Sequence, residues 1–130
     1  MRPLFHPSVE DITVEGILHA LSDTVRGAIY AEIVGSGRPQ NCSNFLNIRE
    51  KPVPKSTLSL HFKALREAGQ IRSERRGVEM HNTSRRAEIE QRFPGLIEAI
   101  VYAHKVQLEN NRQAGKAGRR KLARRIKRSK

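Results

Sequence analysis

A helix pattern that ends at a glycine and leads at once into a hairpin pattern constrains this fold most. Pro52 and Pro54 disfavour helical backbone at the residues before them, so the helix begins at about Lys55. Apolar side chains recur at helical spacing up to Gly69, a residue suited to a helix end. Two short strand-like runs follow, on either side of Arg76-Gly77, a dipeptide that closes hairpins. We therefore predict a long helix followed directly by a two-stranded wing.

Three further helical segments are predicted before this one. The first begins near Thr13, and Asp23 caps the second because its carboxylate can accept the free amides of a first turn. The second helix ends at Gly35 or Gly37, and a short helix over residues 42–48 precedes the proline pair. A short helix, a turn and a longer helix form a helix-turn-helix. The predicted fold class is mainly α with a small two-stranded β wing, a winged helix-turn-helix.

The net charge of +12 is concentrated at the C-terminal end. Residues 1–110 hold 15 Lys and Arg against all 13 acidic residues, whereas residues 111–130 hold 10 Lys and Arg and no acidic residue. Because Gly115 and Gly118 loosen this segment, we expect residues 112–130 to form a basic tail that is disordered without DNA. Such a tail is either a solvated extension or an electrostatic arm for an anionic partner.

Composition argues against a membrane, secreted or enzymatic protein. No apolar run approaches the roughly 18 residues that span a bilayer, and no signal-peptide pattern is visible at the N-terminus. The single Cys42 cannot support a disulfide framework, so we expect a reducing compartment. No nucleophile–base pair, Gly-rich phosphate loop or carboxylate pair stands out, and the five histidines are scattered. We therefore expect no enzymatic activity.

The outward face of the helix after Pro54 carries groups that suit DNA. Small hydroxyl side chains near its start allow close approach while donating and accepting hydrogen bonds at base edges. Lys55, Lys63 and the positive end of the helix dipole favour phosphates. The same composition also fits an ordinary amphipathic helix with a solvated face, and composition alone does not separate the two interpretations.

Three segments resemble the ArsR-type family of winged helix-turn-helix bacterial transcriptional regulators. Residues 56–69, with the run Ser-Thr-Leu-Ser-Leu-His-Phe-Lys, and the basic wing after them are similar to that family's recognition helix and wing. Residues 18–26 resemble its first signature, and residues 92–96 are similar to the region of the dimer helix. The likeness covers about residues 10–110, in order and at the family's spacing.

The resemblance implies a homodimer that binds a two-fold symmetric operator in double-stranded DNA and represses transcription in the bacterial cytoplasm, at the nucleoid. A flexible lead-in would span 1–11, and the winged domain with its dimerisation helices 12–111. The DNA-binding residues it implies, with the phosphate-binding lysine above, are Lys55, Ser56, Thr57, Ser59, Leu60, Lys63, Arg72, Arg75 and Arg76. The dimer interface it implies, on the first and last helices, is Val14, Ile17, Leu18, Ile97, Ile100, Val101, His104 and Leu108.

The metal sites familiar in this family are incomplete here. One uses a Cys-x-Cys pair in the short helix before the recognition helix, where this chain has only Cys42. The other uses Asp, His and Glu side chains on the last helix, where this chain offers Glu98, His104 and Glu109. We therefore predict no metal and no cofactor. The effector, including a redox role for Cys42, stays open. Asn82 departs from the family's common aromatic at the end of the wing.

The basic tail supports a rival interpretation, a nucleoid-type or general nucleic-acid-binding protein with little sequence preference. A second rival is a module whose winged helix has lost its DNA-binding role and docks a protein partner. The hydroxyl-rich recognition helix favours a sequence-specific regulator over both.

Overall fold

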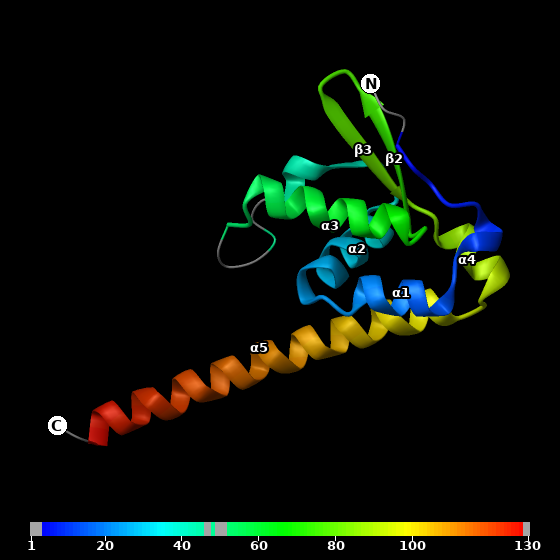
Figure 1. The fold of residues 1–130 in the computed structure, drawn as a ribbon. Helices are drawn as coiled ribbons and strands as arrows, with labels where there is room; N and C mark the ends of the chain where they lie inside the picture. Colours follow the sequence, from blue (N-terminus) through cyan, green and yellow to red (C-terminus); the bar gives the residue numbers. More distant parts are fainter. Residues whose placement is uncertain (1–3, 46–47, 49–51, 129–130) are drawn as a thin grey trace. The chain divides into compact units, whose positions relative to one another are not determined.

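A computed structural model describes residues 4–45, 48 and 52–128 (Figure 1). It has a mainly helical architecture with a small antiparallel sheet, so the predicted fold class is confirmed. The chain divides into two compact units, Met1–Ile97 and Glu98–Lys130. In chain order the elements are the 3₁₀ helix η1 (Val9–Asp11), α1 (Val14–Leu21), α2 (Thr24–Ser36), β1 (Gln40–Asn41), the 3₁₀ helix η2 (Cys42–Phe45), α3 (Lys55–Glu67), β2 (Ile71–Arg76), β3 (Glu79–Ser84), α4 (Arg86–Arg92) and α5 (Leu96–Arg128).

The core of the first unit lies between α1, α2, α3 and the sheet. Asp23 caps α2 as predicted, since its carboxylate accepts the amides of Val25 and Arg26 at 2.9 and 3.1 Å. Thr13 caps α1 by accepting the amide of Gly16 at 3.0 Å. Caps at both starts fix where each helix begins and therefore which side chains turn inward. The largest of these buried side chains are Tyr30, Phe62, Ile12, Ile17, Ile29 and Leu65.

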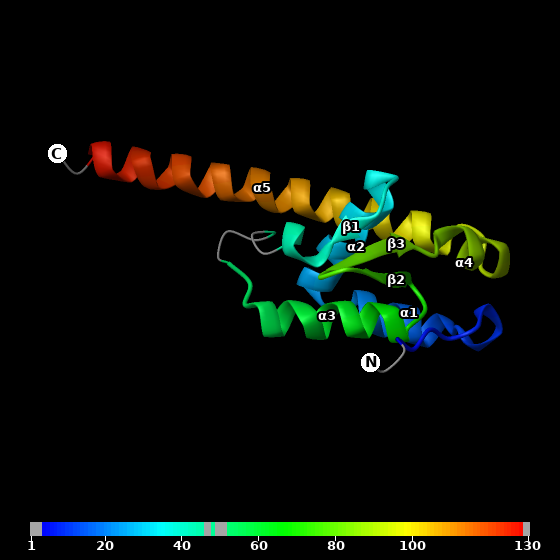
Figure 2. The same ribbon diagram turned by 90° about the horizontal axis from the view of Figure 1, so that it is seen from above.

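The sheet has three strands, in the order β1-β3-β2, where the sequence predicted two (Figure 2). The antiparallel pair β2 and β3 forms the predicted wing. The additional strand β1 pairs Gln40 with Asn82 of β3. Two residues are too few to show an alternating pattern, so sequence analysis predicted no strand here.

The wing turns at Gly77-Val78, one residue later than predicted. Arg76 pairs with Glu79 across this turn. Gly77 has φ 63°, and no residue other than glycine has positive φ in the described part of the chain. A two-residue hairpin turn with positive φ at its first position alone is of type II′. Val78 is thereby left fully exposed at the wing tip.

The end of α3 is a Schellman motif around Gly69, which has φ 82°. The amide of Gly69 donates to the carbonyl of Arg66, and the amide of Gln70 donates to that of Leu65, both at 3.0 Å. A Cβ added to Gly69 would lie 2.6 Å from Cδ1 of Ile12, so the backbone here touches the core directly. Both the positive φ and this close approach require glycine.

Residues 4–12, expected to belong mostly to a flexible lead-in, are bonded to the rest of the first unit in the structure. The amide of Ser73 on β2 donates to Nε2 of His6 at 3.0 Å. The buried Arg85 donates from Nη1 to the carbonyl of Pro7 at 2.7 Å and forms an ion pair of 2.6 Å with Glu88. Residues 1–3 lie outside the described residues.

The second unit is α5 from Glu98 onward, and it continues as helix to Arg128. Sequence analysis expected a disordered tail from residue 112. The continuous helix has a simple physical basis, because α5 contains no proline and is rich in Ala, Lys and Arg. Gly115 and Gly118 weaken such a helix by about 1 kcal/mol each without breaking it. None of the helices in the described ranges is long and apolar enough to cross a membrane.

We predict that Gly69→Ala destabilises the fold by about 3 kcal/mol, from left-handed strain and from overlap with Ile12. Gly95→Ala is the matched control, since Gly95 has the same φ of 82° and nothing within 4 Å of an added Cβ. Its cost should be about 1 kcal/mol. Urea unfolding of both variants measures the difference, and equal losses would contradict the close approach to Ile12.

Candidate nucleic-acid interface

Helix α3, the predicted recognition helix, buries one stripe and presents the other to solvent. Leu58, Phe62 and Leu65 are buried, and the helix packs against α2, β2 and η2. The rings of Phe62 and Phe45 meet edge to face with centroids 5.5 Å apart. This packing fixes the rotation of α3. It leaves exposed the predicted contact residues on the helix, which are Lys55, Ser56, Thr57, Ser59, Leu60 and Lys63.

The N-terminal end of α3 has no side-chain cap. Pro54 occupies the capping position, and its carbonyl accepts the amide of Leu58 at 2.9 Å. The amides before Leu58 on the helix therefore have no cap to accept them, beside the exposed ammonium of Lys55. Free amides and a positive dipole end are suited to holding a phosphate.

The three predicted wing arginines are exposed, and ion pairs are seen for Arg72 and Arg76. Arg72 pairs with Glu88 at 3.0 Å, and Arg76 pairs with Glu74 at 3.5 Å. Burial alone would raise the pKa of Glu88, but the hydrogen bonds and charges of Arg85 and Arg72 outweigh it and lower that pKa. The carboxylate therefore stays ionised at neutral pH and available to pair with Arg72.

Asn82, noted only as a departure from the family pattern, joins the three strands and η2. It is fully buried, and its Oδ1 accepts the hydroxyl of Ser73 at 2.7 Å. Its Nδ2 lies 3.1 Å from the carbonyl of Gln40 and 3.3 Å from Sγ of Cys42. An aromatic ring could not make these bonds. The position therefore links β1, η2, β2 and β3 through one side chain.

The predicted dimer residues differ in how far they are exposed. Ile17 and Ile97 are fully buried within the first unit, so they stabilise the protomer and offer no surface to a second copy. Leu18 on α1 is 50% exposed, and Leu108 on α5 is 49% exposed. The remaining positions are Val14 on α1 and Ile100, Val101 and His104 on α5.

Cys42 lies in η2 as a half-buried free thiol. Burial raises its pKa, and this effect outweighs the hydrogen bond from Asn82 and the charge of Arg66. A protonated thiol is a poor nucleophile and a poor metal ligand. In the described part of the chain, no three His, Cys, Asp or Glu side chains gather into a group that could hold a metal ion.

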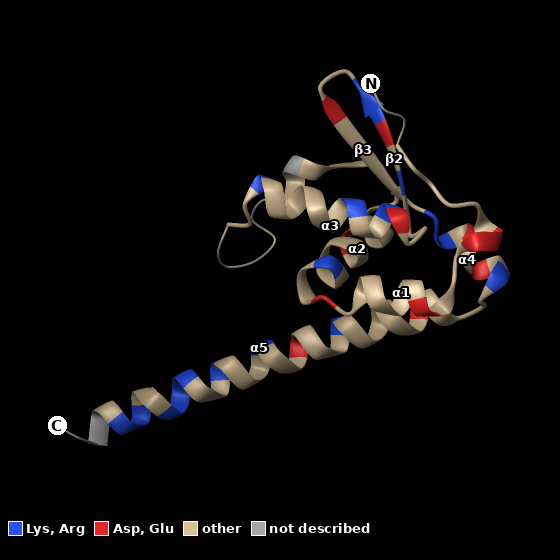
Figure 3. Cartoon of the chain, viewed as in Figure 1, with Lys and Arg blue, Asp and Glu red and all other residues tan. Residues whose placement is uncertain are grey.

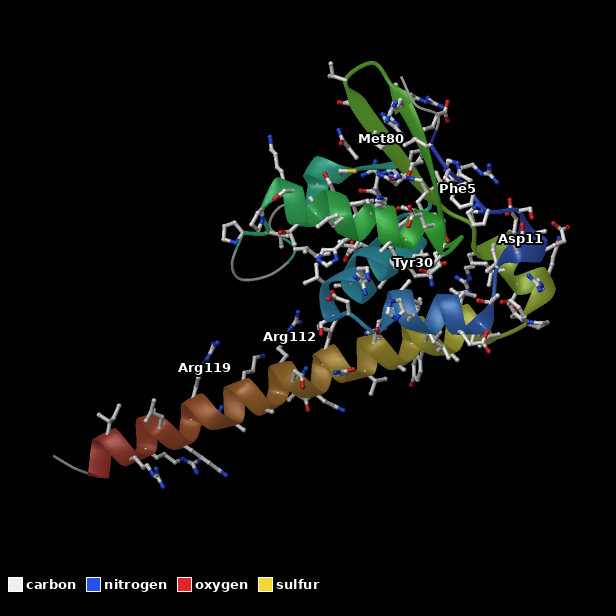
Figure 4. The ribbon with its side chains drawn as sticks, in the orientation of Figure 1. Phe5, Asp11, Tyr30, Met80, Arg112 and Arg119 are labelled. Atoms are coloured by element: carbon white, nitrogen blue, oxygen red, sulfur yellow. The ribbon has the colours of Figure 1, made fainter. Side chains whose placement is uncertain are left out.

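The C-terminal half of α5 is a dense cationic surface. Figure 3 shows Lys and Arg, without Asp or Glu, along the helix beyond Glu109. Arg112 and Arg119, labelled in Figure 4, are seven residues apart and project from one face. Leu122 and Ile126 are also exposed. This half of the helix can neutralise phosphates without reading bases.

A comparison with solved structures finds an ArsR-like transcriptional regulator from Rhodococcus sp. RHA1. The two chains are 27% identical, and the match covers 77% of this chain and 90% of the other with a TM-score of 0.50. The chain has the ArsR-like fold. Neither the protein-family models nor the curated proteins yield a match.

In the ArsR-like fold, α3 and the β2–β3 hairpin occupy the helix and wing positions of a winged helix-turn-helix. Sequence analysis did not include Arg66 of α3 among the candidate site residues. Arg66 follows Lys55, Ser59 and Phe62 at spacings of four, three and four residues, so it shares their side of α3. That spacing was visible in the sequence, but the packing of Arg66 against Ser73 of the wing was not.

Proposed function

We propose that this protein is a DNA-binding transcriptional regulator that acts as a homodimer on a two-fold symmetric operator. The observation that carries the proposal is the exposed hydroxyl and lysine face of α3, held in fixed rotation beside an arginine-bearing wing. Hydroxyl groups on a helix suit base edges in the major groove of DNA, and cations on the helix and the adjacent hairpin suit the flanking phosphates. Repression is the simplest outcome, since an operator-bound dimer blocks access of polymerase to a promoter in the bacterial cytoplasm.

Within this proposal the recognition helix specifies sequence and the other cations supply affinity. Ser56, Thr57 and Ser59 would contact base edges, and Leu60 would contact a thymine methyl group. Lys55 and Lys63 would contact phosphates, as would the predicted wing arginines Arg72, Arg75 and Arg76. Two copies would pair through the apolar stripes of α1 and α5, with Leu18 and Leu108 as the exposed positions.

Binding to fragmented genomic DNA at near-physiological salt, followed by sequencing of retained fragments, tests the function as a whole. One shared palindromic motif is expected. Uniform recovery of all fragments would favour instead a general nucleic-acid-binding protein, the alternative that the cationic half of α5 supports. The stoichiometry of the complex on the recovered site tests the dimer.

We predict that Ser59→Ala and Lys63→Ala each lower operator affinity about tenfold, because each removes one interaction worth roughly 1–2 kcal/mol. Ser59→Ala should also relax the base preference at one position, whereas Lys63→Ala should weaken all sequences equally. Arg38→Ala is the matched control, since it removes one exposed cation outside the interface. Fluorescence anisotropy with operator and scrambled duplexes measures both effects. Unchanged affinity in both variants would exclude α3 as the recognition helix.

We predict that ending the chain at Asn111 lowers affinity for all DNA and flattens the dependence of log affinity on log salt. The slope should fall by about 0.9 for each phosphate that the deleted segment neutralises in the full-length complex. That segment carries 10 Lys and Arg. A full-length variant with Leu122→Gln and Ile126→Gln keeps every charge and should keep the slope. A truncated protein with an unchanged slope would make this segment a solvated extension.

A further inference from the structure

A groove of about 340 Å³ lies between the flank of α3 and the wing. Its apolar lining comes from Leu58 and Phe62 on α3 and from Val78 and Met80 at the wing. Figure 4 labels Met80 on the wing beside α3. This volume is at the lower end of the range for small-molecule sites, which are typically apolar with a few placed polar groups.

The charged side chains that line the groove are both cations, Lys55 and Arg66. Lys55 is exposed, whereas Arg66 is half-buried. Arg66 donates from Nε to the hydroxyl of Ser73 at 3.2 Å, and it forms no salt bridge with any carboxylate in the described ranges. A partly desolvated guanidinium without a carboxylate partner is unfavourable on its own and presents unused donors to an anion.

A hydrogen-bonded chain behind the groove holds this guanidinium in place. Ser73, which accepts from Arg66, donates to Oδ1 of the buried Asn82 at 2.7 Å. Asn82 in turn donates to Sγ of Cys42, which also lines the groove. Because these partners sit on β2, β3 and η2, Arg66 is oriented before any ligand arrives, and pre-orientation reduces the entropy lost on binding.

We propose that this groove binds a small organic acid, with its carboxylate on Arg66 and its apolar body against Leu58, Phe62 and Met80. A planar guanidinium matches a carboxylate with two parallel hydrogen bonds. A neutral apolar ligand would leave Arg66 unpaired, and an inorganic anion would leave the apolar walls in water. The acid would also crowd Lys55 and Ser59, so it would weaken DNA binding; this last step rests on the proposed function.

The test uses the full chain labelled with ¹³C at the methionine methyl groups, titrated with benzoate by NMR. The sequence has two methionines, so the Met80 signal reports on the groove and Met1 serves as an internal reference. Benzamide, which has the same ring without the charge, is the matched ligand control, and sodium chloride controls for ionic strength. Benzoate should shift the Met80 signal saturably, and benzamide should bind about tenfold more weakly.

Two variants test whether the carboxylate of benzoate binds at Arg66. Arg66→Gln should raise the half-saturating benzoate concentration about tenfold, with Arg86→Gln, an exposed arginine on α4, as its control. Val78→Glu should do the same by placing a carboxylate at the groove. Since Val78 is fully exposed, this change leaves the core intact even if Arg66→Gln unfolds the protein. Ala87→Glu adds the same charge at an exposed site on α4 and should have no effect.

The acid site would be overturned if benzoate left the Met80 signal unmoved. It would also be overturned if benzamide half-saturated the shift of that signal at the same concentration as benzoate. Equal weakening by Ala87→Glu and Val78→Glu would also overturn it, since benzoate would then follow overall charge. These measurements contain no DNA. A saturable Met80 response in a protein without operator binding would therefore contradict the proposed function and leave the acid site standing. Saturating benzoate that does not lower operator affinity would overturn the competition with DNA.

Discussion

The geometry of the interface depends on how Gly69 and Gln70 join α3 to the wing. Gln70 is fully buried, and its backbone and side chain bond to three other elements. Its amide donates to Leu65 of α3, its carbonyl accepts the amide of Arg85 before α4, and its Nε2 donates to the carbonyl of Ile17 on α1. The angle between α3 and the wing is therefore set by directional bonds as well as by apolar packing.

A second polar centre, at Asn82, fixes the wing from its other side. The side chain of Asn82 reaches β1, η2 and β2 from its position on β3. Both the oxygen and the nitrogen of the Asn82 amide have partners, and a buried amide satisfied in this way favours one arrangement of strands over its alternatives. The two-residue strand β1 is too short to hold its own register. The Asn82–Gln40 bond supplies that register, and through it the position of η2 beside α3.

Local signals in the sequence predicted the main elements, and non-local interactions explain what they missed. The buried stripe of α3, the cap at Asp23 and the break at Gly69 were each visible within one helical turn. The strand β1 and the importance of Asn82 were not, because their partners lie about 40 residues apart in the chain. The exposed face of α3 could be predicted, whereas Arg66 gained its setting only when the wing came to lie beside it. Likewise Ile17 and Leu18 are neighbours on one predicted stripe, yet only Leu18 keeps an exposed surface.

The distribution of charge separates two requirements that a DNA-binding protein must meet. Helix α3 and the wing belong to a segment with nearly balanced charge, where Glu74 and Glu88 form ion pairs with Arg76 and Arg72. Phosphate attraction from such a surface is modest, so in the proposed complex base recognition would decide where the protein binds. The excess of cations lies instead on the C-terminal half of α5, where no carboxylate occurs beyond Glu109. In the proposed complex, affinity from that helix would be the same for every sequence and would depend on salt. Discrimination between bases by α3 would come from hydrogen bonds and apolar contacts rather than from charge, so each could change without altering the other.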